Sequence, residues 1–210
     1  MATLVLASNN AKKLVELRTL CEPLGVQLQP QSAFGVAEAE EPHVTFVENA
    51  LAKARHAAAA TGLPTLADDS GLCVEALGGA PGVISSHFAP LIAEPGDREQ
   101  QRRRQDAANN RLLLQKLAGV SERRARFVSV LVALRSAQDP EPLIAFGRWE
   151  GEVLPQLRGE GGFGYDPLLW IPALGHTVAE LGADLKNQHS HRAMAARAMR
   201  VLMHEAWHLG

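Results

Sequence analysis

The chain has 210 residues, of which 46% are hydrophobic and 21% are charged, so it is long enough to bury a full-sized core. Its formal net charge of −2 excludes a general attraction to nucleic acid or to an anionic membrane, and any phosphate site must be local. Two isolated cysteines do not make a disulfide framework, and no window approaches the roughly 20 apolar residues of a membrane span. We expect one domain over residues 1–210, unexported and in the cytoplasm.

The first segment predicts a strand, a polar turn and a helix. Residues 3–7 form a short apolar run of the β type, and three polar residues follow at positions 8–10. Leucines at helical spacing then predict the helix: Leu14, Leu17, Leu20 and Leu24.

A capped helix and a second strand come next. Thr45 and Glu48 have the T-x-x-E spacing of a capping box, in which each side chain satisfies a free backbone donor of the other residue. This predicts a helix over residues 46–60. Residues 64–67 then predict a buried strand that ends in the polar cluster at residues 68–71.

The second half of the chain adds an antiparallel element. Residues 90–105 are polar and arginine-rich, which predicts a surface insertion before a helix over residues 106–117. The apolar segments 126–135 and 142–149 flank a Gln-Asp-Pro turn and predict a hairpin.

A strand over residues 167–171 and a final helix beginning at Ser190 complete the pattern. The apolar side of this helix is expected to carry Met194, Ala198, Val201 and Leu202. Interleaved helices and strands with one antiparallel hairpin predict an α/β fold, with a mixed sheet flanked by helices. Ligands in such folds bind where strands end.

The turn after the first strand is a candidate anion site. A helix N-terminus offers unpaired backbone donors and a partial positive charge, and hydroxyl, amide and ammonium groups surround it here. The glycine frame of a Walker A loop is missing. The alternative is a polar helix cap with two solvated lysines. The residues concerned are Ser8, Asn9, Asn10, Ala11, Lys12 and Lys13.

Adjacent carboxylates suggest a metal site. Asp68 and Asp69 repel each other unless a cation lies between them, and Glu41 precedes the capped helix. Magnesium typically takes one or two protein carboxylates together with substrate phosphates and water. A carboxylate not used for the metal can deprotonate an attacking water. The alternative is a solvated Asp-Asp-Ser-Gly turn.

A glycine-rich segment covers residues 159–167 and contains a literal G-x-G-x-x-G. A dinucleotide fingerprint must open a helix after a strand, whereas these glycines lead into Asp-Pro and an apolar run. The segment is better interpreted as flexible backbone that lets a base approach Phe163 and Tyr165. A plain glycine turn with core aromatics is the alternative.

Basic residues surround the start of the last helix. Ser190 is a suitable N-cap, and the alternative to a functional role is a capped helix with exposed basic groups. In the functional interpretation, Lys186, His191 and Arg192 donate to a phosphate or to the oxygen of a 6-oxopurine.

Two further patterns are not interpreted as sites. Residues 204–208 spell H-E-x-x-H, but only two residues follow, so the third ligand usual in zinc proteases has no place. Three arginines at positions 102–104 are diluted by acidic neighbours and predict a solvated surface.

Taken together, six segments resemble the ITPase/HAM1 family of pyrophosphatases for non-canonical purine nucleoside triphosphates, and especially its bacterial dITP/XTP branch. Their order is more specific than any single segment. They are LVLASNNAKKLVEL, EEPHVTFVENALAKARHAA, LPTLADDSGLCVEALGGAPGV, DAANNRLLL, GEGGFGYDPLLW and SHRAMA.

The resemblance implies a fold with two lobes around an active-site cleft, usually in a homodimer that requires Mg²⁺. It implies that residues 8–13 and Lys53 face the triphosphate, and that Glu41 and Asp68 are magnesium ligands. Asp69, which also belongs to the metal set, is the implied proton acceptor, and Ser70 is an implied substrate contact.

The resemblance also implies which residues bind the base. It implies a base and sugar pocket at residues 163–166 and purine recognition from near the last helix. The pocket residues are Phe163, Gly164, Tyr165 and Asp166, and the recognition residues are Lys186, His191 and Arg192. Because 6-oxopurines present an acceptor where adenine presents a donor, a buried Arg192 can reject adenine.

The chain departs from the family pattern after Gly82. Ile84, His87 and Phe88 replace a tyrosine and a Ser-Ala-Arg-Tyr stretch, and residues 94–105 are longer than usual. Two alternatives to the favoured activity remain at this point. One is a Maf-like pyrophosphatase for modified or pyrimidine nucleotides, and the other is a non-catalytic nucleotide-binding module.

Overall fold

The computed structural model describes residues 2–90 and 96–209. It divides into two compact units. Unit 1 comprises Met1–Asp69, Ser129–Arg148 and Asn187–Gly210, and unit 2 comprises Ser70–Val128 and Trp149–Lys186. Residues 91–95, near the start of the surface insertion predicted over residues 90–105, lie outside the described residues.

Seven strands form one mixed sheet in the order β2-β1-β3-β4-β5-β6-β7. The strands β2 and β3 are parallel to β1, whereas β6 is antiparallel to β5 and to β7. This confirms the predicted α/β class with a mixed sheet. The bounds are β1 (Ala2–Leu6), β2 (Val26–Pro30), β3 (Thr65–Val74), β4 (Arg124–Leu134), β5 (Leu143–Val153), β6 (Leu169–Ile171) and β7 (His176–Thr177).

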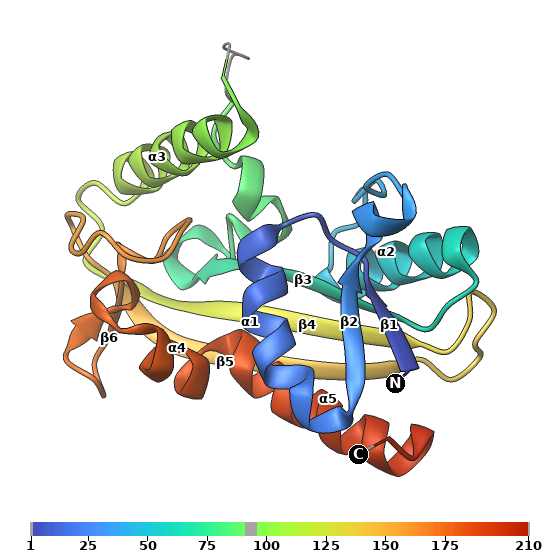
Figure 1. Ribbon diagram of the computed structural model, residues 1–210. Helices are drawn as coiled ribbons and strands as arrows, with labels where there is room; N and C mark the ends of the chain where they lie inside the picture. Colours follow the sequence, from blue (N-terminus) through green and yellow to red (C-terminus); the bar gives the residue numbers. More distant parts are fainter. Residues whose placement is uncertain (1, 91–95, 210) are drawn as a thin grey trace. The chain divides into compact units, whose positions relative to one another are not determined.

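Five α-helices and five short 3-10 helices lie in the described residues (Figure 1). The α-helices are α1 (Ala11–Cys21), α2 (Phe46–Thr61), α3 (Arg98–Lys116), α4 (Ala183–His189) and α5 (His191–Trp207). The 3-10 helices are η1 (Glu22–Leu24), η2 (Gln31–Phe34), η3 (Glu75–Leu77), η4 (Gly82–His87) and η5 (Val178–Glu180). No helix in residues 2–90 and 96–209 is both long and apolar enough to cross a membrane.

Side-chain caps determine where the longer helices begin. The Ser190 hydroxyl accepts from the backbone N–H of Ala193 at 3.1 Å, as predicted for the start of α5. The Thr45 hydroxyl likewise accepts from the Glu48 N–H at 3.3 Å. The Glu48 carboxylate, however, accepts from the Thr45 hydroxyl at 2.5 Å, so the predicted capping box is only half formed. The α3 helix begins eight residues earlier than predicted, because Asp97 caps it with a full capping box.

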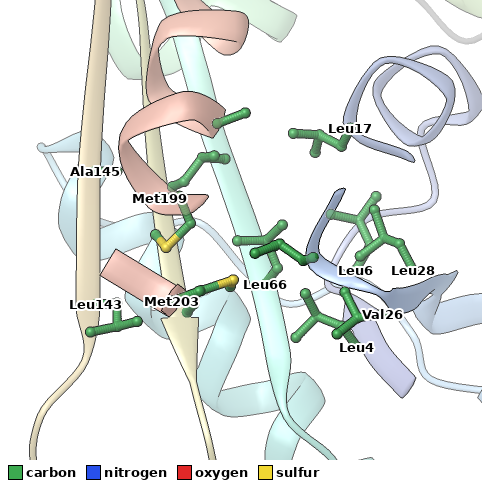
Figure 2. Packing of buried hydrophobic residues seen from close by; sticks show 14 of the residues in the cluster. Leu4, Leu6, Leu17, Val26, Leu28, Leu66, Leu143, Ala145, Met199 and Met203 are labelled. Atoms are coloured by element: carbon green, nitrogen blue, oxygen red, sulfur yellow. The ribbon is translucent and has the colours of Figure 1, made fainter. Parts of the chain in front are cut away.

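The core of unit 1 is formed by residues of the strands β1 to β5 and of the helices α1 and α5 (Figure 2). Its largest contributors are leucines on the strands, with Leu17 on α1 and methionines on α5. Because β1 is paired on both edges and covered on both faces, its apolar run is continuous rather than alternating. The labelled members are Leu4, Leu6, Leu17, Val26, Leu28, Leu66, Leu143, Ala145, Met199 and Met203.

The buried side of α5 differs from the predicted one. Val201 is 55% exposed and Ala198 is also exposed, whereas Met199 and Met203 are buried. The prediction was wrong for Ala198 and Val201, because small residues, not only large apolar ones, make the packed face, whereas Leu202 packs against the core as predicted. Ala195 and Ala196 are fully enclosed. They allow α5 to lie close to the sheet, since the carbonyl of His191 would be 1.8 Å from a Cβ at Gly147 of β5.

The polar cluster of residues 68–71 lies inside a strand, not in a turn after it. The strand β3 extends over ten residues, and Asp68 and Asp69 are 1% and 4% exposed. Polar residues persist in this buried strand because cations and hydroxyls from other elements satisfy them. Alternation along β3 sends Asp68 to the same face as Leu66 and Asp69 to the opposite face.

Candidate functional site

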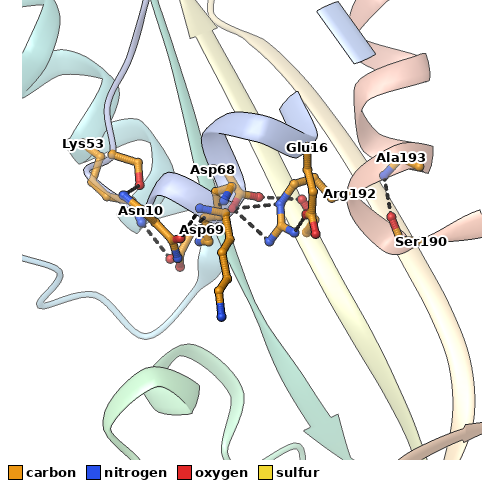
Figure 3. Close-up of polar contacts among 12 residues, drawn as sticks. Asn10, Glu16, Lys53, Asp68, Asp69, Ser190, Arg192 and Ala193 are labelled. Carbon is orange, nitrogen blue, oxygen red and sulfur yellow. Dashed lines mark hydrogen bonds and ion pairs between the residues drawn. The ribbon is translucent and has the colours of Figure 1, made fainter. Parts of the chain in front are cut away.

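Asp68 is surrounded by side-chain hydrogen-bond donors on the face of β3 that carries α1 and α5 (Figure 3). The Ser129 hydroxyl of β4 donates to one carboxylate oxygen at 2.6 Å. The Lys13 ammonium is 2.7 Å from the other oxygen, and the Arg192 guanidinium is 3.4 Å from it. Burial on its own would raise the pKa of Asp68, but the charges of Arg192 and Lys13 hold that pKa well below its usual range. These contacts therefore favour the ionised form of Asp68.

The Arg192 guanidinium is only 1% exposed and is held by carboxylates on two elements. It donates through Nη1 to Glu16 on α1, and through Nε and Nη2 to Asp68 on β3. Burial acts to lower the pKa of Arg192, but Asp68 and Glu16 raise it above its usual value. In this structure the predicted purine donor is thus occupied by protein carboxylates.

Asp69 faces α2 and shares a lysine with Glu41. The Lys53 ammonium on α2 donates to Asp69 Oδ1 at 2.8 Å and lies 3.1 Å from Glu41 Oε2. Burial raises the pKa of Asp69 to about 6, against the opposing effect of the Lys53 charge. For Glu41, burial also acts upward, but Lys53 and the contact with Asp69 leave its pKa below the usual value. The two carboxylates are close enough to affect each other's ionisation.

The donor set around Asp69 fits a hard divalent cation. Asp69 Oδ2 is buried and has no hydrogen-bond partner among the described residues, while the Glu41 side chain is 41% exposed. Two carboxylates with a free oxygen are the ligands that Mg²⁺ takes alongside substrate phosphates. Asp68 differs, because Ser129, Lys13 and Arg192 already use both of its oxygens. Across residues 2–90 and 96–209, no group of three or more acidic, histidine or cysteine side chains is arranged around one point.

The predicted anion site at the start of α1 has an internal cap. The Asn10 side chain accepts from the backbone N–H groups of Lys12 and Lys13 at 3.1 and 3.3 Å. The Ser8 hydroxyl accepts from the Asn10 N–H at 3.1 Å. Two of the backbone donors expected to meet an anion are therefore engaged. The Asn9 side-chain oxygen is buried without a partner in the described part of the chain, and Ala11 is exposed.

In unit 2, the glycine-rich segment forms turns rather than a helix, so the dinucleotide fingerprint is excluded. The Asp166 carboxylate organises the segment by accepting from the Phe163 N–H at 2.9 Å and from the Lys186 ammonium at 3.0 Å. The same ammonium lies 4.6 Å from the centre of the Phe163 ring, a cation–π contact. The structure therefore brings together two of the predicted base-pocket residues, Phe163 and Asp166, and the predicted recognition residue Lys186.

Tyr165 points into the interior of unit 2. Its side chain is 3% exposed, and its hydroxyl donates to the Ser85 carbonyl at 2.9 Å. Burial, together with the charge of Asp106, raises the pKa of the Tyr165 phenol well above its usual value. The alternative of a core aromatic describes Tyr165, whereas Phe163 is only partly buried.

The remaining candidates are placed as follows. His191 is 6% exposed in the first turn of α5, and Ser70 lies in β3 directly after Asp69. The H-E-x-x-H pattern runs into the end of α5, where His208 is a left-handed C-cap and His204 contacts the Leu209 carbonyl at 3.1 Å.

Sequence reasoning missed several residues that hold these side chains. Glu16 follows Lys13 by three positions, and this helical spacing could have placed both on one face of α1. Ser129 and Ser85 sit in apolar surroundings, and a lone buried hydroxyl is a weak signal. Asp106 and Asn110, both in the DAANN segment, bond to Gly164, and nothing local indicated that contact.

Comparison with known proteins gives a consistent result. The model of the Ham1 family matches residues 4–202. A protein of Leptothrix cholodnii named dITP/XTP pyrophosphatase is 68% identical over 98% of this chain and 99% of its own length. One of the same name from Methylibium petroleiphilum is 64% identical over 97% and 98%.

Solved structures agree in fold. A HAM1 protein from Coxiella burnetii is 43% identical, with a TM-score of 0.87 over 98% of this chain and 100% of that one. The Ham1 protein of Staphylococcus aureus is 33% identical, with a TM-score of 0.82 over 97% and 98%.

Proposed function

The chain belongs to the Ham1 family, and on that premise we propose that it hydrolyses dITP, ITP and XTP or dXTP to the nucleoside monophosphate and pyrophosphate. This activity removes non-canonical purines from the nucleotide pool. The relatives named dITP/XTP pyrophosphatase match almost the whole chain, which favours this activity over a Maf-like one. The buried acidic pair argues against a purely passive binding module.

The observation that carries the chemistry is the environment of Asp69. One of its oxygens is fixed by Lys53 at 2.8 Å, and the other is buried with no partner among the described residues. A fixed carboxylate, one oxygen of which has no hydrogen-bond partner, can orient a water and accept its proton. Attack of that water forms a bond to the α-phosphorus, the bond to the bridging oxygen breaks, and pyrophosphate leaves.

Glu41 would hold Mg²⁺ together with the Asp69 oxygen that Lys53 contacts, which leaves the other Asp69 oxygen to accept the proton of the water. When bound there, the ion would neutralise charge on the triphosphate. Lys53 lies between the same two carboxylates, 2.8 Å from Asp69 and 3.1 Å from Glu41. Asp68, the third ligand implied by the resemblance, acts in our proposal mainly through Lys13 and Arg192.

The phosphates are proposed to bind at the start of α1. Lys12 and Lys13 supply positive charge, and Ser8, Asn9 and the exposed turn at Ala11 supply polar contacts. A triphosphate has to compete with Asp68 for the Lys13 ammonium, and with Asn10 for the first backbone donors of the helix. Substrate binding should therefore rearrange these contacts, so that Lys13 and Lys53 stabilise the phosphate charge.

The base is proposed to be read by the segment around Phe163 and by groups near α5. Phe163 and Gly164 offer a partly open surface, and Asp166 fixes Lys186 beside it. Arg192, with His191, is proposed to donate to the 6-oxygen, for which the guanidinium must exchange a carboxylate partner for the base. A site that requires this hydrogen bond can disfavour adenine by roughly 10⁴ or more.

A pyrophosphate-release assay tests the proposal. The purified protein is given dITP, ITP, XTP, dATP, dGTP, dTTP and UTP, with and without magnesium. We expect release from the first three far above the others and only with the metal. Highest activity on dTTP or UTP would favour the Maf-like alternative, and no release from any substrate would reject the enzyme.

We also propose that the protein works in the cytoplasm as a homodimer. Support for the dimer comes from the family resemblance alone. Light scattering of the purified chain, at concentrations around those of the assay, measures its mass directly. A monomer mass would reject the dimer without affecting the proposed reaction.

A further inference from the structure

Two side chains of α3 hold one peptide of the glycine-rich segment from both sides. The Asp106 carboxylate accepts from the Gly164 N–H at 2.9 Å, and the Asn110 amide donates to the Gly164 carbonyl at 2.9 Å. The two residues are four positions apart on α3, so they project from the same helical face. Both backbone groups of Gly164 are thereby satisfied by side chains more than 50 positions earlier in the chain.

This contact matters because the segment has no regular structure of its own. Gly164 has φ of 61°, in the left-handed region, and no strand ladder fixes the turns around it. Phe163 is tied to Asp166 through its own N–H, and Lys186 joins the same carboxylate. The position of the Phe163 ring therefore depends on contacts within the segment, on Lys186, and on the hydrogen bonds from α3 to Gly164.

The Asn110 side chain is not placed for stability alone. It is 6% exposed, and its oxygen is buried with no hydrogen-bond partner in the described residues. An unsatisfied buried acceptor costs roughly 1–3 kcal/mol, so an apolar residue would be favoured here if packing were the only demand. The neighbouring Asn109, by contrast, uses its amide and its oxygen to hold the backbone at Ser85, Ser86 and Ala89.

We propose that Asp106 and Asn110 are positioning residues that fix the base-binding conformation of Phe163 and Gly164. The inference rests on the proposed function, because it assigns these two residues to the nucleobase. Neither side chain touches the reacting phosphate in the proposal. Loss of the two hydrogen bonds to Gly164 should therefore weaken substrate binding and base selection, while the chemical step stays nearly unchanged.

Steady-state kinetics on dITP and dATP test this for Asp106→Ala and Asn110→Ala. We expect KM for dITP to rise roughly tenfold, the size of one lost hydrogen bond, with kcat changed less than about twofold. The ratio of kcat/KM for dITP over dATP should fall. Asp106→Asn keeps an oxygen that can accept from the Gly164 N–H, so it should restore KM to within about threefold of wild type. Arg111→Ala, on the exposed side of the same helix, is the matched control.

The outcomes separate the two proposals. Wild-type turnover of dITP with unchanged KM in both alanine variants would overturn the positioning role and leave the activity intact. A kcat loss that tracks a lower melting temperature, with no rescue by Asp106→Asn, would also overturn it. If an alanine variant does not fold, Asn110→Ser is used instead. Its donor lies on a shorter side chain than the asparagine amide, so KM must rise as expected for the alanine variant. A wild-type protein inactive on every nucleotide would remove both proposals.

Discussion

Two carboxylates that are neighbours in sequence have opposite electrostatic environments in β3. Asp68 is surrounded by Lys13, Arg192 and a hydroxyl, and its pKa is lowered. Asp69 has one lysine, a second carboxylate nearby and an open oxygen, and burial raises its pKa to about 6. Strand alternation produces this division, because adjacent side chains point to opposite faces and meet different helices. One residue becomes a structural anion and the other a candidate proton acceptor.

At the residue scale, Asp69→Asn should remove activity without unfolding the protein. An amide cannot accept the proton of the attacking water, so pyrophosphate release from dITP should fall at least about 100-fold. The melting temperature should stay close to wild type or rise, because a buried carboxyl is replaced by a neutral group. Asp184→Asn, an exposed aspartate in α4, is the control. Undiminished release would reject the role of Asp69.

Arg192→Ala should be strongly destabilising. It leaves Glu16 without the guanidinium and leaves Asp68 buried with fewer cations, and removing one partner of a buried pair costs roughly 3–5 kcal/mol. Urea unfolding measures this loss. Arg55→Ala, an exposed arginine on α2, should change stability by less than about 0.5 kcal/mol. A variant as stable as wild type would show that the guanidinium is not required by the fold.

At the element scale, close approach of backbones decides the packing of unit 1. Gly147 of β5 lies directly under the first turn of α5, where any Cβ would overlap the His191 carbonyl. This explains why the buried face of α5 is made of alanines and methionines, and why large exposed residues such as Val201 were misassigned from periodicity. A helical pattern gives the spacing of a face but not how near the next element lies.

Gly147→Ala should therefore lower the free energy of unfolding by more than about 2 kcal/mol, because a backbone carbonyl cannot move aside as a flexible side chain does. Thermal unfolding followed by circular dichroism measures the effect. Gly182→Ala is the matched control, since a Cβ there meets nothing within 4 Å. Equal melting temperatures for the two variants would contradict the tight contact.

The turn between β4 and β5 depends on one aspartate. The Asp139 carboxylate accepts from the backbone N–H of Arg135 at 2.9 Å, from that of Glu141 at 3.1 Å and from the Arg135 guanidinium at 3.0 Å. The hydrogen bond from the Arg135 side chain is the largest cause that lowers the pKa of Asp139. A lowered pKa stabilises the fold above the unfolded value near 4, and this contribution is lost as the pH falls further.

Asp139→Asn should accordingly lower stability at pH 7, and the difference from wild type should shrink between about pH 4 and pH 2. Urea midpoints measured across this range give the comparison. Asp184→Asn, whose carboxylate is exposed, should show no such convergence. A difference that is constant with pH would show that the Asp139 charge does not stabilise the turn.

At the scale of the whole molecule, the chain passes between the two units inside secondary structure. The unit boundaries fall inside four elements: after Asp69 in β3, Val128 in β4, Arg148 in β5 and Lys186 in α4. A strand that belongs to both units cannot lose its hydrogen bonds in one unit without disturbing the other. We therefore expect the units to unfold together, although each has its own buried residues.

Tryptophan reporters can test this expectation. Trp207 lies in unit 1, and Trp170 lies in unit 2. Each variant keeps one of these two residues, and the other tryptophans are changed to phenylalanine. In each variant, the urea midpoint from tryptophan fluorescence should coincide with the midpoint from circular dichroism. Two transitions separated within a single variant would show that the units unfold independently.

The sequence by itself determined the fold class and the proposed chemistry of this protein. Apolar runs, caps such as Ser190 and turn residues act over a few positions, and six ordered segments identified the family; these signals are local or additive along the chain. The tertiary structure alone decided that Asp68 and Asp69 face different helices. It also decided that Arg192 donates to Glu16 and that side chains of α3 form hydrogen bonds with Gly164. Such contacts join residues from 54 to 176 positions apart, and their energies depend on burial and distance, which no local pattern of residues contains.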